Sequence, residues 1–395
     1  MSAAAARVDA FLEQLARRER PEAWIHVRAA AHLRGEAAAV DARVAAGEAL
    51  PLAGVVVAVK DNIDVAGCPT TAAAPSYRYE PRDDAPAVAR LRAAGAIVVG
   101  KTNLDQFATG LVGTRSPFGA VRHAESAAHI SGGSSSGSAV AVALGLVDLA
   151  LGTDTAGSGR VPAALHGLWG FKPTKGRIPT TGVVPACASL DVVTVFARDP
   201  RLGRRAVDLM AGPDAGDPPS SRDRPLAPPP TGGLIVVPAR EELGGMAPGW
   251  VDAFDAVVDA ARAAGFVVEE RGLGPLLAAA RMLYESSFVA ERYAAVGDHL
   301  EAARDADTPG IDPTVSGIVL AGARFTAAQL FSDLRTLERH RAEASSLLSG
   351  ATAILTPTTT WHPTLAEVAA DPVGANARMG RFTNFANLLD MAAVA

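Results

Sequence analysis

The sequence predicts an α/β protein in which helices cover one large mixed or parallel β-sheet. Short apolar runs with the length of buried strands alternate with longer segments of helical spacing. This alternation continues on both sides of a stretch rich in Pro, Asp and Arg at residues 212–233. The 395 residues are 49% hydrophobic and 20% charged, which is ordinary for a globular protein and excludes a mainly disordered chain.

The first half of the chain begins with a helical segment over residues 1–50. Its Ala-rich stretch at 3–48 has helical spacing and predicts two helices. The elements expected next are a pair of buried strands at 52–65, a helix at 84–94, a buried strand at 96–99, a Gly/Ser loop at 131–138, an apolar helix at 139–146 and a strand at 148–152. A second glycine-rich loop follows at 153–160, and short strands and turns extend to about residue 198.

The stretch at 212–233 is expected to be an exposed loop or linker. The elements expected after it are a strand at 234–238, helices at about 248–264, 275–302 and 326–348, and a strand at 351–357. No internal repeat is visible. The sequence therefore predicts one domain over residues 51–395, preceded by the helical segment.

Composition excludes several classes of protein. The formal net charge is −5, so no general basic field favours nucleic acid or an anionic membrane as a partner. Cys68 and Cys187 form no CxxC pattern, which argues against a disulfide scaffold and a structural zinc site. The N-terminus lacks a signal-peptide pattern, and the longest apolar stretch, 139–151, is shorter than the ~20 residues of a membrane helix. We expect a cytoplasmic protein.

Two short motifs occur outside the context that their chemistry requires. Residues 95–102 match the phosphate-binding pattern GxxxxGKT, but the residues between the glycines are themselves strand-like and a helix precedes them. Lys101 is therefore expected to be structural. Residues 133–137 match GxSxG, yet no convincing strand leads into the serine and no downstream histidine has a distinctive setting.

A third group of residues combines a lysine with two glycine-rich loops. Lys60 lies in AVKDN, and the loops are GGSSSGS at 132–138 and GTDTAGSGRVPA at 152–163. A buried lysine can lose its proton and act as a base for a serine nucleophile, while backbone amides of the loops hold an oxyanion. Only four lysines occur among 37 basic residues, which favours a special role for Lys60. These residues alone equally allow two flexible loops and an ordinary lysine.

The same residues resemble the amidase signature family. The matching segments are VKDN at 59–62, GGSS at 132–135, GTDTAGSGRVP at 152–162, GKTN at 100–103 and GFKPTKGRIPTTGVVP at 170–185. The resemblance is strongest from about residue 50 to 200. It implies the amidase signature fold, a large mixed sheet covered on both faces by helices, and a Ser–cis-Ser–Lys triad. Ser158 is then the nucleophile, Lys60 the final base, and Ser134 the relay that follows a cis peptide bond.

The resemblance also implies the surroundings of the triad. The backbone amides expected in the oxyanion hole are those of Thr155, Ala156, Gly157 and Ser158. Ser135 is expected to support the triad through hydrogen bonds, and Asp154 and Arg160 are expected to fix the nucleophile loop. This chemistry uses neither a metal nor an organic cofactor.

Within the family, the segments at 104–122, 152–165 and 182–196 resemble the allophanate hydrolase subgroup. By the same resemblance, Tyr284 and Arg292 hold the carboxylate of the substrate, and eight residues of one helix would place them on roughly the same side. Between them, residues 285–288 read ESSF, where that subgroup usually has GGPW, and this difference places an acid near the expected pocket.

The expected function is hydrolysis of allophanate, a small anionic amide, with a functional link to a urea carboxylase. The alternatives are another amidase or an amidotransferase subunit that acts on a different amide, or a non-catalytic fragment that depends on assembly. The segment at 372–395 resembles one that leads into further sheet and helix in relatives, so the C-terminal end is expected to be incomplete. A shortened sheet would leave an unpaired edge, which favours a homodimer.

Overall fold

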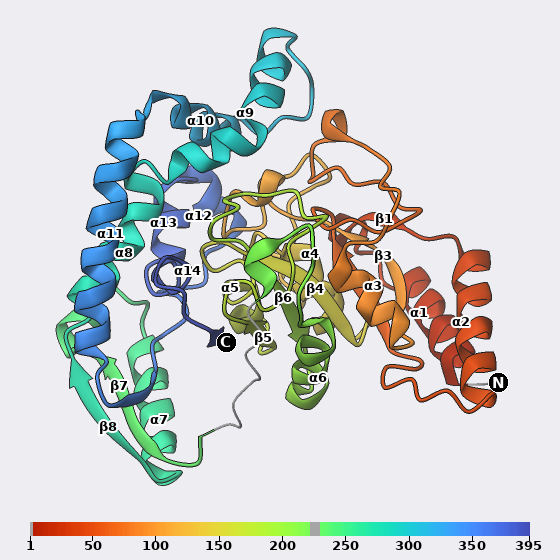
Figure 1. Ribbon diagram of the computed structural model, residues 1–395, viewed down its shortest axis with the longest axis horizontal. Helices are drawn as coiled ribbons and strands as arrows, with labels where there is room; N and C mark the ends of the chain where they lie inside the picture. The colour runs from red at the N-terminus through yellow and green to blue at the C-terminus, as the bar shows by residue number, and fades with distance from the viewer. Residues whose placement is uncertain (1–2, 222–229) are drawn as a thin grey trace.

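The computed structural model describes residues 3–221 and 230–395, and a large mixed sheet occupies its centre (Figure 1). The seven strands have the order β1-β3-β2-β4-β6-β5-β10. Their bounds are β1 Trp24–Val27, β2 Val56–Lys60, β3 Ile97–Thr102, β4 Leu149–Asp154, β5 Trp169–Lys172, β6 Val192–Ala197 and β10 Ala393–Val394. β2 is parallel to β3 and β4, and the other neighbours are antiparallel. The predicted mixed sheet is confirmed.

Helices cover both faces of this sheet because its central strands are apolar on both sides. Val56 and Ala58 of β2 pack on one face with α1, α2 and α4, whereas Val57 and Val59 pack on the other with α3 and α6. The helices of this half are α1 Ala3–Arg17, α2 Ala30–Ala45, α3 Pro86–Ala93, α4 Ser136–Ala143, α5 Val161–Leu165 and α6 Pro200–Met210. The predicted helices at 3–48 and 84–94 are therefore present.

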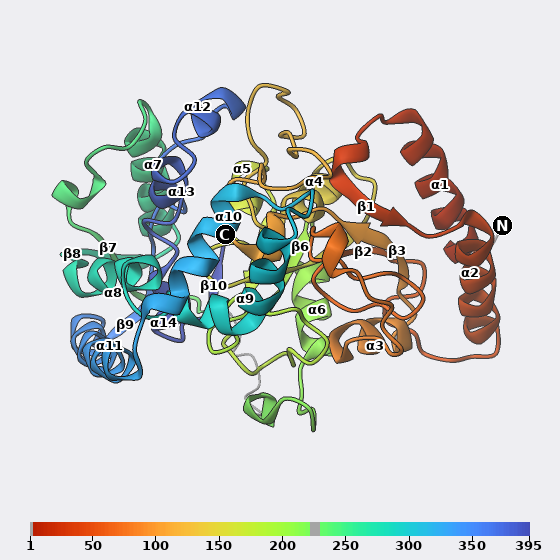
Figure 2. The same ribbon diagram turned by 90° about the horizontal axis from the view of Figure 1, so that it is seen from above.

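The strands that follow the linker form a separate parallel sheet of order β8-β7-β9, which corrects the expectation of a single sheet. Their bounds are β7 Gly233–Pro238, β8 Phe266–Arg271 and β9 Ala351–Ile354. Both views show this sheet at the opposite end of the molecule from α1 and α2 (Figures 1 and 2). Of the predicted loop at 212–233, residues 222–229 lie outside the described residues.

The helices of the second half are α7 Trp250–Ala263, α8 Gly274–Glu285, α9 Val289–Asp305, α10 Pro313–Leu320, α11 Ala327–Leu347, α12 Leu365–Ala370, α13 Gly374–Met379 and α14 Phe385–Leu388. A short 3-10 helix, η6 Ala321–Arg324, joins α10 to α11. In the described ranges, no single helix is long and apolar enough to span a membrane. Only Pro313–Arg324 and Ala327–Leu347, taken together across a 101° bend, meet the length and composition of a span.

Two local predictions were wrong. The segment at 52–65 contains one strand, β2, rather than a pair, because the polar residues after Lys60 turn away from the sheet. The helix predicted at 275–302 is broken into α8 and α9. Ser286 has an extended backbone, and the amide and hydroxyl of Ser287 donate to the Asp333 carboxylate at 2.9 and 2.6 Å, which satisfies the helix end.

Lys101 has a structural role, as the context of its motif predicts. It lies in the middle of the buried strand β3, and its Nζ atom is 3.0 Å from Oδ1 of Asp61. The same ammonium donates to the Thr70 hydroxyl at 2.9 Å and to the Pro69 carbonyl at 3.2 Å. Both side chains of the ion pair are fully buried, so each charge depends on the other.

We predict that Lys101→Met lowers the free energy of unfolding by about 3–5 kcal/mol, because the substitution leaves the Asp61 carboxylate buried without its cation. Arg17→Gln is the control, since its ion pair with Glu13 is exposed and should change stability by about 0.5 kcal/mol or less. Urea denaturation of both variants measures the difference. Equal stability of the two variants would contradict the structural role of Lys101.

Candidate active site

Lys60 stands at the carboxyl end of β2 and is fully buried. Its Nζ atom lies 2.8 Å from the Ser134 hydroxyl and 2.7 Å from the Thr153 hydroxyl. β2 and β4 are parallel neighbours, so the ends that carry Lys60 and Thr153 meet at the same edge of the sheet. The loop before α4 brings Ser134 to this edge. The structure thus joins the predicted base to the predicted relay.

Burial controls the charge of this lysine. Desolvation lowers the pKa of Lys60 to about 7, although the carboxylates of Asp105, Asp191 and Asp154 act in the opposite direction. No ion pair among the described residues includes Lys60. Near neutral pH a substantial fraction of the amine is therefore uncharged and can accept a proton from the Ser134 hydroxyl.

The loop around Ser134 is held by backbone contacts rather than by large side chains. The Gly133–Ser134 peptide bond is cis, as the resemblance implies. The Ser134 carbonyl accepts a hydrogen bond from the Asp105 amide at 3.1 Å, and a Cβ atom on Gly133 would lie 2.1 Å from the Asp105 carboxylate. Ser135 connects this loop to β4, because its hydroxyl donates to the Thr153 carbonyl at 3.1 Å and accepts from the Thr153 amide at 3.3 Å.

Ser158 lies in the loop after β4 and is 2% exposed. Its hydroxyl donates to the Gly110 carbonyl at 3.4 Å, and the hydrogen bonds of the described residues include none between Ser158 and Ser134. The segment 105–110 nevertheless contacts both serines, because Asp105 binds Ser134 at one end and Gly110 binds Ser158 at the other. The structure forms the Lys60–Ser134 link and leaves the link to Ser158 open.

A buried ion pair fixes the loop that carries Ser158. The Arg160 guanidinium donates twice to the Asp154 carboxylate, each time at 2.9 Å, and the Gly159 amide donates to it at 3.0 Å. A third guanidinium hydrogen bond, 2.9 Å long, reaches the Thr383 carbonyl. Burial alone would raise the pKa of Asp154, but Arg160 holds that pKa below its ordinary value, so the pair stays ionised. Both side chains position the loop.

Backbone donors without acceptors lie at the predicted oxyanion hole. The hydrogen bonds of the described residues use none of the amide N–H groups of Thr155, Ala156, Gly157 and Ser158, and all four residues are buried. Buried N–H groups without partners are rare and favour an incoming acceptor. The Thr155 hydroxyl bonds to Asp191. A Cβ on Gly157 would lie 2.4 Å from the Thr383 hydroxyl, so only glycine allows this close packing.

Arg292 is a buried cation without an acidic partner. It is 1% exposed, and no ion pair of the described residues includes it. Its guanidinium donates to the Thr109 hydroxyl at 2.9 Å and to the Tyr284 hydroxyl at 3.3 Å, while its Nε atom has no acceptor. Because Thr109 precedes Gly110, which contacts Ser158, the cation lies one residue from the nucleophile's contact. An uncompensated buried guanidinium favours binding of an anion.

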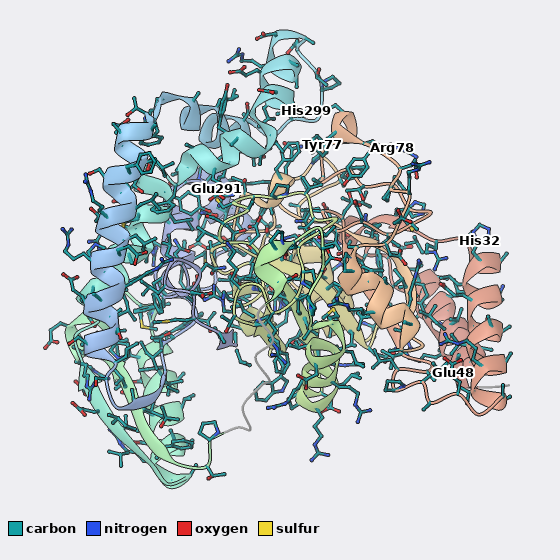
Figure 3. The ribbon with its side chains drawn as sticks, viewed as in Figure 1. His32, Glu48, Tyr77, Arg78, Glu291 and His299 are labelled. Carbon is teal, nitrogen blue, oxygen red and sulfur yellow. The ribbon has the colours of Figure 1, made fainter. Side chains whose placement is uncertain are left out.

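Tyr284 and Arg292 meet, but the reason given by the sequence was wrong. Tyr284 lies at the end of α8 and Arg292 in the first turns of α9, so the two side chains approach from different helices. Glu285, the acid expected near the pocket, is exposed to solvent. Glu291, labelled in Figure 3, accepts from the amide and hydroxyl of Ser189 at 2.5 and 2.6 Å. These acids therefore leave Arg292 without a counterion.

The sequence did not identify Thr153, Asp105, Thr109 or Gly110 as functional residues. Thr153 orients the Lys60 amine, and the buried Asp105 carboxylate accepts from the amides of residues 112, 113 and 115 at 3.0–3.2 Å. Thr153 adjoins Asp154 within the second glycine-rich loop, which was a usable signal. The segment 105–110 had no such signal, because only the fold brings it to the triad. In the described ranges, no group of three His, Cys, Asp or Glu side chains is arranged to hold a metal ion.

Comparison with protein families matches residues 6–395 to the family called Amidase. The chain belongs to the amidase family. Its sequence is 47% identical to urea amidolyase of Saccharomyces cerevisiae over 351 residues, which are 88% of this chain and 19% of that protein. It is also 47% identical to urea amidolyase of Lachancea kluyveri, over 349 residues that make up the same shares of the two proteins.

A relative with a different printed activity is a component of the glutamyl-tRNA(Gln) amidotransferase of Thermus thermophilus. The two sequences are 37% identical over 343 residues, which are 80% of this chain and 71% of that protein. The chain thus resembles both a protein that acts on urea-derived amides and one that belongs to an amidotransferase.

Solved structures agree with these matches. The structure of Kluyveromyces lactis allophanate hydrolase superimposes with a TM-score of 0.91 at 41% identity, over 99% of this chain and 64% of that one. The chain therefore spans about a fifth of the length of the urea amidolyases and about two thirds of this allophanate hydrolase. The amidase signature fold expected from the sequence is confirmed.

We predict that Thr153→Val lowers kcat about 10- to 100-fold, because the substitution removes the hydroxyl that orients the Lys60 amine but keeps the size of the side chain. Thr153→Ser retains the hydroxyl and should keep most of the activity. Steady-state kinetics of the two variants, with circular dichroism to verify folding, makes the comparison. Equal losses in both would show that the methyl group, rather than the hydrogen bond, matters.

Proposed function

We propose that this chain hydrolyses the terminal amide of allophanate (urea-1-carboxylate) and releases ammonia. The observation that carries the proposal is the buried guanidinium of Arg292, which has no acidic partner and is joined through Thr109 and Gly110 to Ser158. A small substrate with one carboxylate and one amide can occupy both ends of this arrangement. The similarity to urea amidolyase and to allophanate hydrolase supports the same substrate.

In the first half of the proposed reaction, the substrate carboxylate binds Arg292 and the Tyr284 hydroxyl. Ser158 turns from Gly110 toward Ser134, and the uncharged Lys60 takes a proton through Ser134 as the Ser158 oxygen attacks the amide carbon. The oxyanion accepts hydrogen bonds from the free amides of residues 155–158. The C–N bond then breaks, and the relay returns the proton to the nitrogen, so ammonia leaves.

In the second half, water attacks the acyl group on Ser158. Its proton passes through Ser134 to Lys60 and then returns to the Ser158 oxygen as the ester bond breaks. The product is N-carboxycarbamate, which decomposes to carbon dioxide and ammonia. No step requires a metal or an organic cofactor.

A second candidate is the hydrolysis or transfer of ammonia from another amide. The similarity to an amidotransferase component over 80% of the chain favours it, since the triad serves any amide that reaches Ser158. The identity of the carboxylate-binding residues distinguishes the two candidates, because a neutral amide has nothing to place against Arg292. The homodimer, the cytoplasmic location and the functional link to a urea carboxylase stay predictions.

We predict that Arg292→Ala lowers kcat/KM for allophanate roughly 100-fold, because the substrate carboxylate loses its charged hydrogen bonds. The activity toward a neutral amide such as propionamide should change only a few-fold. Ammonia release from each substrate, measured with the purified chain, gives both numbers. A similar loss on both amides would contradict the role of Arg292 and favour the second candidate.

Ser158→Ala is the control for this assay, because it removes the proposed nucleophile while keeping the loop. Ammonia release by the unmodified chain must exceed that of Ser158→Ala. If the two are equal on every amide, the chain is a non-catalytic fragment that depends on assembly, and the proposed function is wrong.

We predict that kcat/KM for allophanate increases with pH and levels off above an inflection near pH 7. The pKa of Lys60 is lowered to about 7, so the amine is protonated below this value and free to act as a base above it. Rates measured from about pH 5.5 to 9 test the prediction, and Lys60→Met should leave a slow rate without this inflection. A rate that falls between pH 6 and 8 would contradict an uncharged Lys60 as the base.

A further inference from the structure

A cavity of about 570 Å³ adjoins the carboxylate-binding residues and belongs to none of the catalytic groups. It is lined by α10 and η6 on one side and by α13, Tyr284 and Arg115 on the other. Tyr284 is shared, because its ring lines the cavity and its hydroxyl contacts Arg292 at 3.3 Å. The volume is several times larger than a molecule the size of allophanate needs.

The cavity is continuous with the segment that contacts Ser158. Arg115 donates to the Thr109 carbonyl at 3.0 Å, and the Asn376 side chain accepts from the Leu111 amide at 2.7 Å. Residues 109–111 therefore contact the cavity wall through these side chains, while Thr109 and Gly110 contact Arg292 and Ser158. A molecule in the cavity would lie next to the substrate rather than at a remote place on the surface.

The charges that line the cavity have one sign. Arg115 is 3% exposed and Arg324 is exposed at η6, and no ion pair of the described residues includes either guanidinium. Arg324 lies over the Phe325 ring, 4.9 Å from its centroid, and has no hydrogen bond in the described part of the chain. The described lining contains no acidic residue, since Asp105, which attracts Arg115, lies outside it. A wall with this charge favours an anion.

The remaining wall is apolar. Val289, Ile318 and Ala321 line the cavity together with Gly317, and a Cβ atom on Gly317 would have no neighbour within 4 Å. A ligand that fits such a wall has a short chain of methylene groups, since these bury apolar area without an unpaired polar group. The carboxylate at Arg292 and a second anion at Arg324 would then be joined by this chain.

We propose that this cavity is a second anion subsite, in which Arg324 binds the distal carboxylate of a ligand whose first carboxylate is held by Arg292 and Tyr284. The inference rests on the proposed function, because it extends the ligand class of the same site. The site then takes dicarboxylates and carboxylated amides with a second acidic group, and binds them more tightly than compounds of the length of allophanate. η6 carries Arg324 to this position by packing on α9, where a Cβ on Gly322 would lie 2.8 Å from the Val289 carbonyl.

Calorimetric binding of malonate, succinate, glutarate and adipate tests the proposal without using allophanate turnover. We expect the affinity to rise about tenfold from malonate to the best longer acid. Arg324→Gln should abolish this gain and leave malonate unchanged, and Gly317→Leu, which fills the cavity on a helix that tolerates the side chain, should do the same. Arg335→Gln is the matched control, because it removes an equally exposed charge from α11 outside the cavity.

Each outcome decides the question. Affinities that do not rise with chain length, a rise that survives both Arg324→Gln and Gly317→Leu, or the absence of binding by every acid overturns the second subsite. Arg292→Ala separates this result from the proposed function. If it weakens malonate while the longer acids gain nothing, the carboxylate site stands and the second subsite is wrong. If it leaves malonate unchanged, the role given to Arg292 in the proposed function is wrong.

Discussion

An uncharged amine in the protein interior is the constraint on which the site depends. Lys60 must be dry enough to lose its proton near neutral pH, and its burial at the end of β2 lowers its pKa to about 7. Three carboxylates oppose this effect from a distance, and none forms an ion pair with it. A direct acidic partner would keep the lysine charged, as Asp61 is placed to do for Lys101 on the neighbouring strand. Two buried lysines of one sheet therefore differ in role because of their partners.

The segment 105–110 connects the parts of the site. Its first residue holds the Ser134 loop, Thr109 holds Arg292, and Gly110 holds Ser158. Phe107 and Ala108 within it have φ angles of +50° and +53°, a backbone conformation that side chains disfavour. Phe107 packs edge-on against Tyr77 and His299 at 5.3 and 5.9 Å, near the labelled pair in Figure 3, and this packing holds the strained backbone in place.

The sequence predicted the large sheet and the Lys60–Ser134 contact because both follow from local patterns. Uninterrupted apolar runs such as residues 56–59 have the composition of strands buried on both faces, and the motifs lie directly at the ends of these runs. The second sheet was missed because β7 and β9 are apolar in the same way, and no local pattern states which strands pair. The break between α8 and α9 depends on Asp333, about 46 positions later in the chain, which no local pattern at residues 286–287 reveals.

The two halves of the site come from different parts of the fold, and this separation explains how one family serves different amides. The base, relay, nucleophile and oxyanion donors lie on the large sheet and its loops, within residues 60–160. The anion-binding groups come from α8 and α9, which pack on these loops from outside the sheet. Changes in the helices can alter the charge that faces the substrate without disturbing Lys60. A buried guanidinium costs stability unless an anion pairs with it, so a substrate carboxylate supplies what the fold leaves out.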